Sequence, residues 1–357
     1  MRILLVRLRQ IGDVVFTTPA IHALRQRFPD AHLSYVVEPA AAPIVLDNPH
    51  LNQVILAPRA RGLRGLIDDL ALGRRLRAER YELAIDFHGG PRASLLTWLS
   101  GAPERIGYEV AGRSWMYTRR IARPRELRPR HSVENQWDLL APLGVAPPDR
   151  ALFPMEMPVD AAVAAAVAGR LAEAGVAADD RLVVIHVSAG NPFRRWPAAH
   201  FVELAVSLAA GDPRRRVLVT SGPSERDAAG RVIVEARAGL GDGRAAQILS
   251  CGEFSLAELR ALLDRASLYI GGDSGPLHVA ATTGVPIVGL YGPTLPIRSA
   301  PWRAASWITE SVDAGELPCR PCDQRVCEPG DFRCLTSIKP AQVFDAAERA
   351  LAGEDRT

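Results

Sequence analysis

The chain has 357 residues, is 48% apolar and carries a net charge of only +3 at neutral pH. This length exceeds that of most single hydrophobic cores and predicts two domains, and the small charge argues against a nucleic-acid partner. No apolar run reaches the roughly 18–20 residues that cross a bilayer, and Arg7 and Arg9 interrupt the apolar N-terminus. We therefore expect a first core strand instead of a secretion signal, and a cytoplasmic protein that can touch a membrane peripherally.

Strands and helices alternate through the first half of the chain. A helix is predicted from Thr18–Pro19 towards Phe28, because a Thr-Pro pair suits a helix start. Buried strands are predicted at residues 3–6, 33–37, 53–56 and 83–87. This rhythm favours a parallel, doubly wound sheet.

The loop after the first strand, Arg9 to Val15, contains Gly12 and Asp13. Gly12 suits a tight turn, and Asp13 would stand at the carboxyl end of a central strand, where it could take a proton from a substrate hydroxyl. A Gly-Asp turn is also common as a purely structural feature. No G-x-G-x-x-G motif occurs there, which argues against a dinucleotide-dependent dehydrogenase. Asp86 and His88, after the fourth strand, are interpreted as structural.

The strand–helix rhythm restarts after a proline-rich passage and an alanine-rich helix at residues 159–175. Strands are predicted at 182–187, 216–220, 268–270 and 287–291, with helices from Pro197, from Glu225 and over 256–263. We place the domains at 1–155 and 181–340, joined by a linker and helix at 156–180 and followed by a C-terminal helix at 341–357. Ligands of open α/β sheets gather beyond the carboxyl ends of strands, so the loops there are the candidate site.

The segment Gly271–His278 joins a strand to a helix and contains Asp273, Ser274 and Gly275. A carboxylate, a hydroxyl and exposed amides at such a turn suit a phosphate-bearing, sugar-like ligand. An Asp/Ser cap followed by a proline explains the same residues without any ligand. His278 could donate to a phosphate oxygen, or it could be a buried, hydrogen-bonded structural histidine.

Two further loops of the second half carry polar side chains. Ser188 begins a small-residue loop that leads to Arg194 and Arg195, and guanidinium groups pair well with the oxygens of a diphosphate. Glu225 begins the next helix and could hold ribose hydroxyls, although a helix-capping acid is an equally ordinary explanation.

The order, spacing and amino-acid sequences of these loops resemble those of glycosyltransferase family 9, the lipopolysaccharide heptosyltransferases. The resemblance lies in Ile3–Pro29 with its Gly12-Asp13 turn and in Asp273–Thr294, which includes Gly284-Val285-Pro286 and Tyr291-Gly292-Pro293-Thr294. It implies an α/β GT-B fold, in which two Rossmann-like domains face each other across a cleft. The first domain would bind the acceptor and the second ADP-heptose.

The resemblance also implies roles for single residues. Asp13 would be the general base of an inverting transfer to the lipopolysaccharide inner core at the membrane surface, on lipid A-Kdo or a heptosyl acceptor. The donor-binding residues would be Ser188, Arg194, Arg195, Glu225, Asp273, Ser274, Gly275 and His278. Among these, Glu225 would hold the ribose. The family commonly has a lysine before its Trp-Pro pair where this chain has Arg194-Arg195, so either arginine could take the role.

Two metal-related expectations follow from the sequence. The candidate loops contain no Asp-x-Asp clamp, so we expect transfer to need no divalent metal. Four of the five cysteines, Cys319, Cys322, Cys327 and Cys334, form a cluster that could bind structural zinc, remain as free thiols or form occasional disulfides. We expect this segment to lie apart from the donor loops, with a structural role.

Other functions and partners stay open at this stage. A GT-B nucleotide-sugar epimerase, or a nucleotide-sugar-binding protein without activity, would share the two-domain architecture. Between Arg113 and Arg130 the sequence has seven arginines and one acid, which suits either lipid phosphates or a solvated loop. The sequence does not reveal which core sugar accepts the heptose, nor the oligomeric state.

Overall fold

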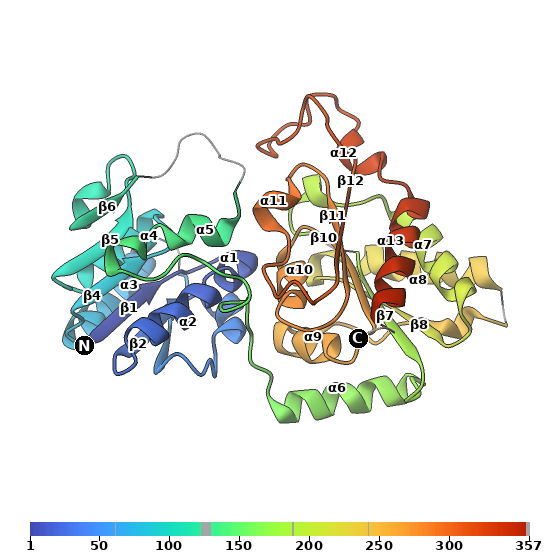
Figure 1. Cartoon of the computed structure of the whole chain (residues 1–357), viewed down its shortest axis with the longest axis horizontal. Helices are drawn as coiled ribbons and strands as arrows, with labels where there is room; N and C mark the ends of the chain where they lie inside the picture. The colour runs from blue at the N-terminus through green and yellow to red at the C-terminus, as the bar shows by residue number, and fades with distance from the viewer. Residues whose placement is uncertain (61, 123–129, 188, 242, 355–357) are drawn as a thin grey trace. The chain divides into compact units, whose positions relative to one another are not determined.

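The computed structural model of the chain describes residues 1–60, 62–122, 130–187, 189–241 and 243–354. It divides into two compact units, Met1–Pro158 and Val159–Thr357. Each unit contains one six-stranded sheet, and the paired strands of both sheets run parallel. Figure 1 labels most of the helices and strands of both units.

The sheet of unit 1 has the strand order β3-β2-β1-β4-β5-β6. Its strands are β1 (Arg2–Val6), β2 (His32–Val37), β3 (Gln53–Leu56), β4 (Leu83–Asp86), β5 (Glu104–Tyr108) and β6 (Arg119–Ile121). Its α-helices are α1 (Ile11–Val15), α2 (Thr18–Arg27), α3 (Gly62–Ala78), α4 (Pro91–Leu99) and α5 (Ser132–Trp137). The central strand β1 is fully buried from Ile3 to Val6, as expected for a parallel strand that is covered on both faces.

Alternate side chains of β1 build one core of this unit. Leu4 and Val6 lie in a buried cluster with Leu72 and Leu76 of α3 and with Leu96 of α4. Because side chains alternate across a strand, Ile3 and Leu5 face the opposite side of the sheet. This packing fixes the carboxyl end of β1, where the next segment begins.

The sheet of unit 2 has the order β12-β11-β10-β7-β8-β9. Its strands are β7 (Arg181–His186), β8 (Arg215–Thr220), β9 (Ile248–Leu249), β10 (Leu268–Gly272), β11 (Ile287–Tyr291) and β12 (Thr309–Asp313). Its α-helices are α6 (Ala161–Glu173), α7 (Ala198–Gly211), α8 (Arg226–Leu240), α9 (Leu256–Leu263), α10 (Gly275–Ala280), α11 (Pro296–Ser299), α12 (Arg333–Thr336) and α13 (Pro340–Glu354).

The core of unit 2 joins its central strands to three helices. Val183 and Ile185 of β7 lie in a buried cluster with Leu204 of α7, Val232 of α8 and Val343 of α13. The predicted fold class, doubly wound parallel α/β sheets, is confirmed. Within the described ranges, no helix is both long and apolar enough to span a bilayer.

The segment after β1 differs from its prediction as a loop. Residues Ile11–Val15 form helix α1, in which the amide of Val14 donates to the carbonyl of Gln10 over 3.0 Å. Gly12 is therefore a helical residue and supplies no left-handed turn. The next helix starts at the predicted Thr18, but the residue before it, Thr17, occupies the N-cap position and makes no side-chain capping bond.

A glycine-to-alanine substitution in β5 tests how closely the ring of Tyr117 packs on this strand. In Gly107→Ala, the new Cβ would overlap the ring of Tyr117, whose hydroxyl is bound to buried Asp86 over 2.6 Å. We expect a loss of about 1–3 kcal/mol in the free energy of unfolding, measured by urea denaturation. The matched control is Gly169→Ala in α6, where the Cβ meets nothing and an exposed helical alanine should stabilise by about 0.5–1 kcal/mol. Equal stabilities of the two variants would contradict this packing.

Candidate functional site

Asp13 projects from the first turn of α1, just beyond the carboxyl end of β1. Its carboxylate forms an ion pair with Arg7, which follows β1 directly. The guanidinium of Arg7 is largely buried, and its Nη1 donates to the carbonyl of Phe87 over 2.7 Å. The Asp13 side chain is 39% exposed, so a fixed cation orients a carboxylate that solvent can still reach.

Asp86, at the end of neighbouring β4, is fully buried and used by its own unit. Its Oδ1 accepts from the amides of His88 and Gly89 at 2.8 and 2.9 Å, and its Oδ2 accepts from the Tyr117 hydroxyl. Burial raises the pKa of Asp86, and these donors partly oppose that effect. The interpretation of Asp86 as structural therefore fits its contacts.

Asp273 is the most enclosed of the predicted donor-site residues, at the carboxyl end of β10. Its side chain is 3% exposed and lies among three polar groups. Arg194 Nη1 and the Thr294 hydroxyl contact its Oδ2 at 3.3 and 2.5 Å, while His278 Nε2 lies 3.4 Å from its Oδ1. Burial alone would raise the pKa of Asp273, but these neighbours stabilise the charged form and hold the pKa at about 2.

His278 has a partner within unit 2, the carboxylate of Asp273. The side chain is buried in α10 beside Asp273, which fits the alternative of a buried structural histidine. Ser274 occupies the N-cap position of α10 without making a capping bond, and its hydroxyl oxygen is buried with no partner among the described residues. The simple serine-cap explanation of this turn is therefore wrong, and Gly275 begins the helix.

The two arginines before Trp196 point to different carboxylates. Besides Asp273, Arg194 binds Gln324, its Nε donating to the amide oxygen over 2.7 Å. Arg195 Nη2 donates to Glu225 Oε1 over 2.6 Å. Since each guanidinium has its own acidic partner, the pair is not interchangeable.

Glu225 is buried at the end of a 3-10 turn and makes no capping bond to α8. Its Oε1 also accepts from the hydroxyl of Ser224 over 2.7 Å. Glu225 thus occupies the N-cap position of α8 without a side-chain capping bond. His186 at the end of β7 is a buried residue that sequence reasoning missed; burial lowers its pKa to about 4, and its Nδ1 lies 3.0 Å from the Thr220 hydroxyl. Ser188 lies outside the described residues.

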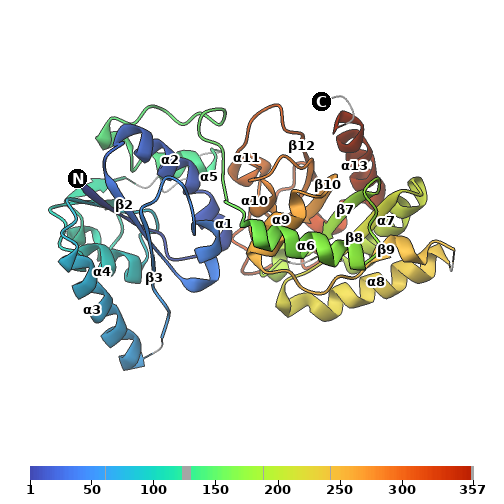
Figure 2. The ribbon, with the colours of Figure 1, turned by 90° about the horizontal axis from the view of Figure 1, so that it is seen from below.

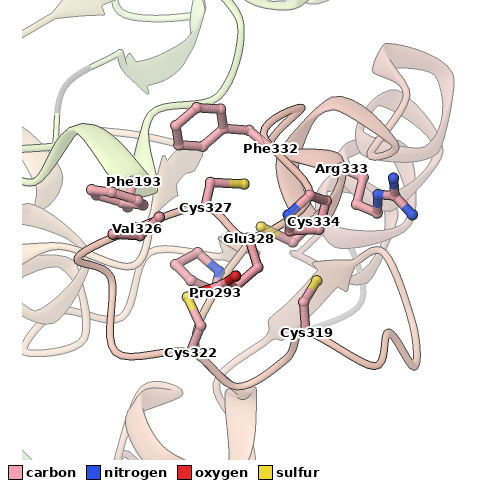
Figure 3. A pocket seen from close by; sticks show the side chains of 11 residues that line it. Phe193, Pro293, Cys319, Cys322, Val326, Cys327, Glu328, Phe332, Arg333 and Cys334 are labelled. Carbon is pink, nitrogen blue, oxygen red and sulfur yellow. The ribbon is translucent and has the colours of Figure 1, made fainter.

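The four clustered cysteines surround a cavity of about 80 Å³ that Phe193 and Pro293 also line (Figure 3). All four are free thiols, and no three of their sulfur atoms lie within 4.8 Å of one another. Burial and the neighbouring cysteines raise the pKa of Cys334. In this conformation the thiols therefore lie too far apart for a closed tetrathiolate metal site, in which ligand atoms are about 4 Å apart.

We expected the cysteine segment to lie apart from the candidate donor loops, but it contacts them. Gln324, between Cys322 and Cys327, accepts from Arg194 and also from Asn191 Nδ2, the latter over 2.8 Å. The Phe193 and Phe332 rings pack at 5.5 Å between centroids. Such long-range contacts have no signal in the local sequence.

Another group of possible metal ligands lies in unit 1. Among the described residues, only His22, His50 and Glu156 in unit 1 bring three possible ligand atoms within 4.8 Å of one another. The two imidazoles are stacked, with 4.1 Å between centroids and 14° between planes. A metal in the plane of both rings would require one ring to turn, so this group is no ready-made site.

Comparisons of the sequence with a family model and with a known protein point to the same family. The model of glycosyltransferase family 9 (heptosyltransferase) matches residues 70–329, well over half of the chain. Lipopolysaccharide heptosyltransferase 3 of Escherichia coli is 29% identical over 343 residues, which are 95% of this chain and 96% of that protein.

Two solved structures share the fold. A glycosyl transferase family 9 protein from Veillonella parvula superposes with a TM-score of 0.81 at 23% identity, covering 98% of this chain and 97% of that one. The E. coli heptosyltransferase WaaC with ADP-2-deoxy-2-fluoro heptose gives 0.68 at 22% identity, covering 98% and 99%. With the two parallel sheets, these matches confirm the GT-B fold class.

The charge of Asp273 predicts an acid-sensitive contribution to stability. Its pKa is about 2 in the folded protein and near 3.8 in an unfolded chain, so the stabilisation is present above about pH 4 and lost as the pH falls through 2. Between about pH 5 and 2 the free energy of unfolding should fall by about 2 kcal/mol more in the native protein than in Asp273→Asn. Parallel curves from urea denaturation at each pH would refute this assignment.

Proposed function

The chain belongs to glycosyltransferase family 9, the heptosyltransferases, and from this premise we propose that it transfers heptose from ADP-L-glycero-D-manno-heptose to the lipopolysaccharide inner core. The acceptor would be lipid A-Kdo or a heptosylated form of it, met at the inner face of the inner membrane. The observation that carries the donor assignment is the buried, ionised Asp273 with Arg194 beside it.

Arg194 suits the diphosphate of the donor. Its Nη1 and Nε are held by Asp273 and Gln324, whereas its Nη2 has no hydrogen-bond partner among the described residues. A guanidinium fixed on one side and open on the other can pair with phosphate oxygens and stabilise the departing ADP. The unpartnered hydroxyl of Ser274 would donate to the same group.

Glu225 suits the ribose. Arg195 and Ser224 occupy its Oε1, and its Oε2 has no partner among the described residues. A carboxylate oxygen held in this way can accept a hydrogen bond from a sugar hydroxyl. Arg195 would then position Glu225, while Arg194 would contact the donor directly.

The proposed reaction is a single inverting displacement. The acceptor hydroxyl attacks the anomeric carbon on the face opposite ADP, the new C–O bond forms, and the bond to the diphosphate oxygen breaks. Asp13 takes the hydroxyl proton, and ADP leaves with the bonding electron pair. Arg7 would keep the carboxylate aimed at the acceptor throughout.

Two other functions can be separated from this one by product analysis. An epimerase would convert the nucleotide sugar without any acceptor, and a binding protein would form no product at all. Release of ADP that depends on the acceptor supports transfer alone. In an epimerase or a binding protein, Asp13 would have no acceptor hydroxyl to deprotonate.

The main test is the substitution Asp13→Asn. We expect kcat to fall by about 10²–10⁴-fold because the base is lost, while ADP-heptose binding measured by calorimetry stays unchanged. ADP release would be assayed with truncated lipopolysaccharide cores as acceptors. Asp30→Asn replaces another exposed acid of unit 1 and should keep the native rate. Native turnover in Asp13→Asn would rule out Asp13 as the base.

We further propose that transfer uses no divalent metal, because Arg194 can supply the positive charge at the diphosphate. Treating the protein with a chelator should leave the initial rate of ADP release unchanged, with the untreated protein as control. Elemental analysis of the same samples would detect zinc held by the cysteines. A rate that falls on chelation and recovers with added Mg²⁺ would overturn metal-independent transfer.

A further inference from the structure

Helix α3 carries an apolar stripe on its exposed surface. Leu63, Leu66, Ile67 and Leu70 follow the spacing i, i+3, i+4, i+7, which aligns them along one side of a helix. Their exposed fractions are 74%, 50%, 57% and 37%. Leucine and isoleucine side chains at this spacing normally face a core, and here they face solvent.

The buried side of α3 points in another direction. Leu72, Gly73 and Leu76 are its buried residues, and a Cβ on Gly73 would meet Leu99 of α4. At roughly 100° per residue, the centre of the exposed stripe lies about 120° around the helix from the centre of these buried positions. The second half of α3 therefore anchors the helix, and the first half stands clear of the rest of unit 1 (Figure 2).

Basic side chains surround the stripe. Arg59 and Arg64 are exposed near its start, and Arg74, Arg75 and Arg77 are exposed on the following turns. Two acids lie on the same half of the helix: Asp68 is exposed, whereas Asp69 is partly buried and is neutralised by an ion pair with Arg92. An apolar stripe bordered by arginines has the chemistry of a helix that lies in the headgroup region of an anionic bilayer.

The topology places this stripe at the functional edge of the sheet. Helix α3 follows the carboxyl end of β3, and Asp13 follows the carboxyl end of β1, two strands away in a parallel sheet. Strands of a sheet are about 4.8 Å apart, so the two strand ends are separated by about 10 Å. A substrate whose sugar reaches Asp13 could thus have its lipid end near α3.

We propose that the first half of α3, residues 62–70, docks unit 1 onto an anionic lipid bilayer by inserting Leu63, Leu66, Ile67 and Leu70 among the acyl chains. The identity of the lipid-linked substrate rests on the proposed function, whereas the docking itself does not. The arginines around the stripe would bind lipid phosphates, which commits the surface to a membrane and not to an apolar protein partner.

Sedimentation with vesicles tests the docking directly. The full chain is mixed with vesicles of phosphatidylcholine containing phosphatidylglycerol, and the bound fraction is compared with that of Leu63→Gln/Leu66→Gln/Ile67→Gln. We expect the triple variant to bind at least about tenfold more weakly, with little change in melting temperature because at least half of each of these residues is exposed. Val234→Gln on α8, which replaces another exposed apolar residue at 67% exposure, should bind like the native protein.

An activity comparison separates this inference from the proposed function. The triple variant should transfer heptose to a deacylated, water-soluble acceptor at the native rate and to a vesicle-embedded acceptor more slowly. Absence of transfer by every protein would refute the proposed function and leave the vesicle result standing. Equal vesicle binding by native and triple-variant proteins would overturn the docking, and so would a native dimer in analytical ultracentrifugation that the triple variant loses.

Discussion

The candidate donor site of unit 2 depends on one buried charge, the carboxylate of Asp273. An ionised group in a protein interior is costly unless charged and hydrogen-bonding partners compensate the lost hydration. Arg194, His278 and Thr294 provide that compensation from three different segments. The carboxylate oxygens of Asp273 thereby hold together the end of β10, helix α10 and the loop that carries Arg194. This requirement explains why the imidazole of His278 lies beside the Asp273 carboxylate.

Each unit contains an ion pair in which one partner is buried and the other is accessible to solvent, and the accessible charges of the two units have opposite signs. In unit 1 the arginine is the hidden partner, since Arg7 is 10% exposed and Asp13 39%. In unit 2 the carboxylate is hidden, since Asp273 is 3% exposed and Arg194 29%. Each buried ion orients an accessible one of the other sign. In the proposed transfer, the accessible carboxylate would take the proton of the acceptor hydroxyl and the accessible guanidinium would stabilise the departing diphosphate.

The sequence predicted the parts of this architecture that local patterns encode. Central strands such as β1 and β7 are buried on both faces, so they appear as continuous apolar runs, and the segments that follow them begin at the carboxyl edge of each sheet. Strands β5, β6 and β12 were missed because they lie towards sheet edges and contain charged residues, and the edge strand β9 was missed because it has only two residues. The pairing of Arg194 with Asp273 and of Arg195 with Glu225 depends on tertiary contacts, which no local pattern contains.

The cysteine segment acts on the donor site through its polar residues. Arg320 donates to the carbonyl of Thr294 over 2.8 Å, and Gln324 accepts from Arg194. Thr294 and Arg194 are two of the three partners that keep Asp273 charged. Whatever fixes the conformation of this segment, be it packed thiols around a cavity or a bound metal, therefore also fixes the groups around the donor carboxylate. The cysteines can thus be necessary for donor binding without one of them touching the donor.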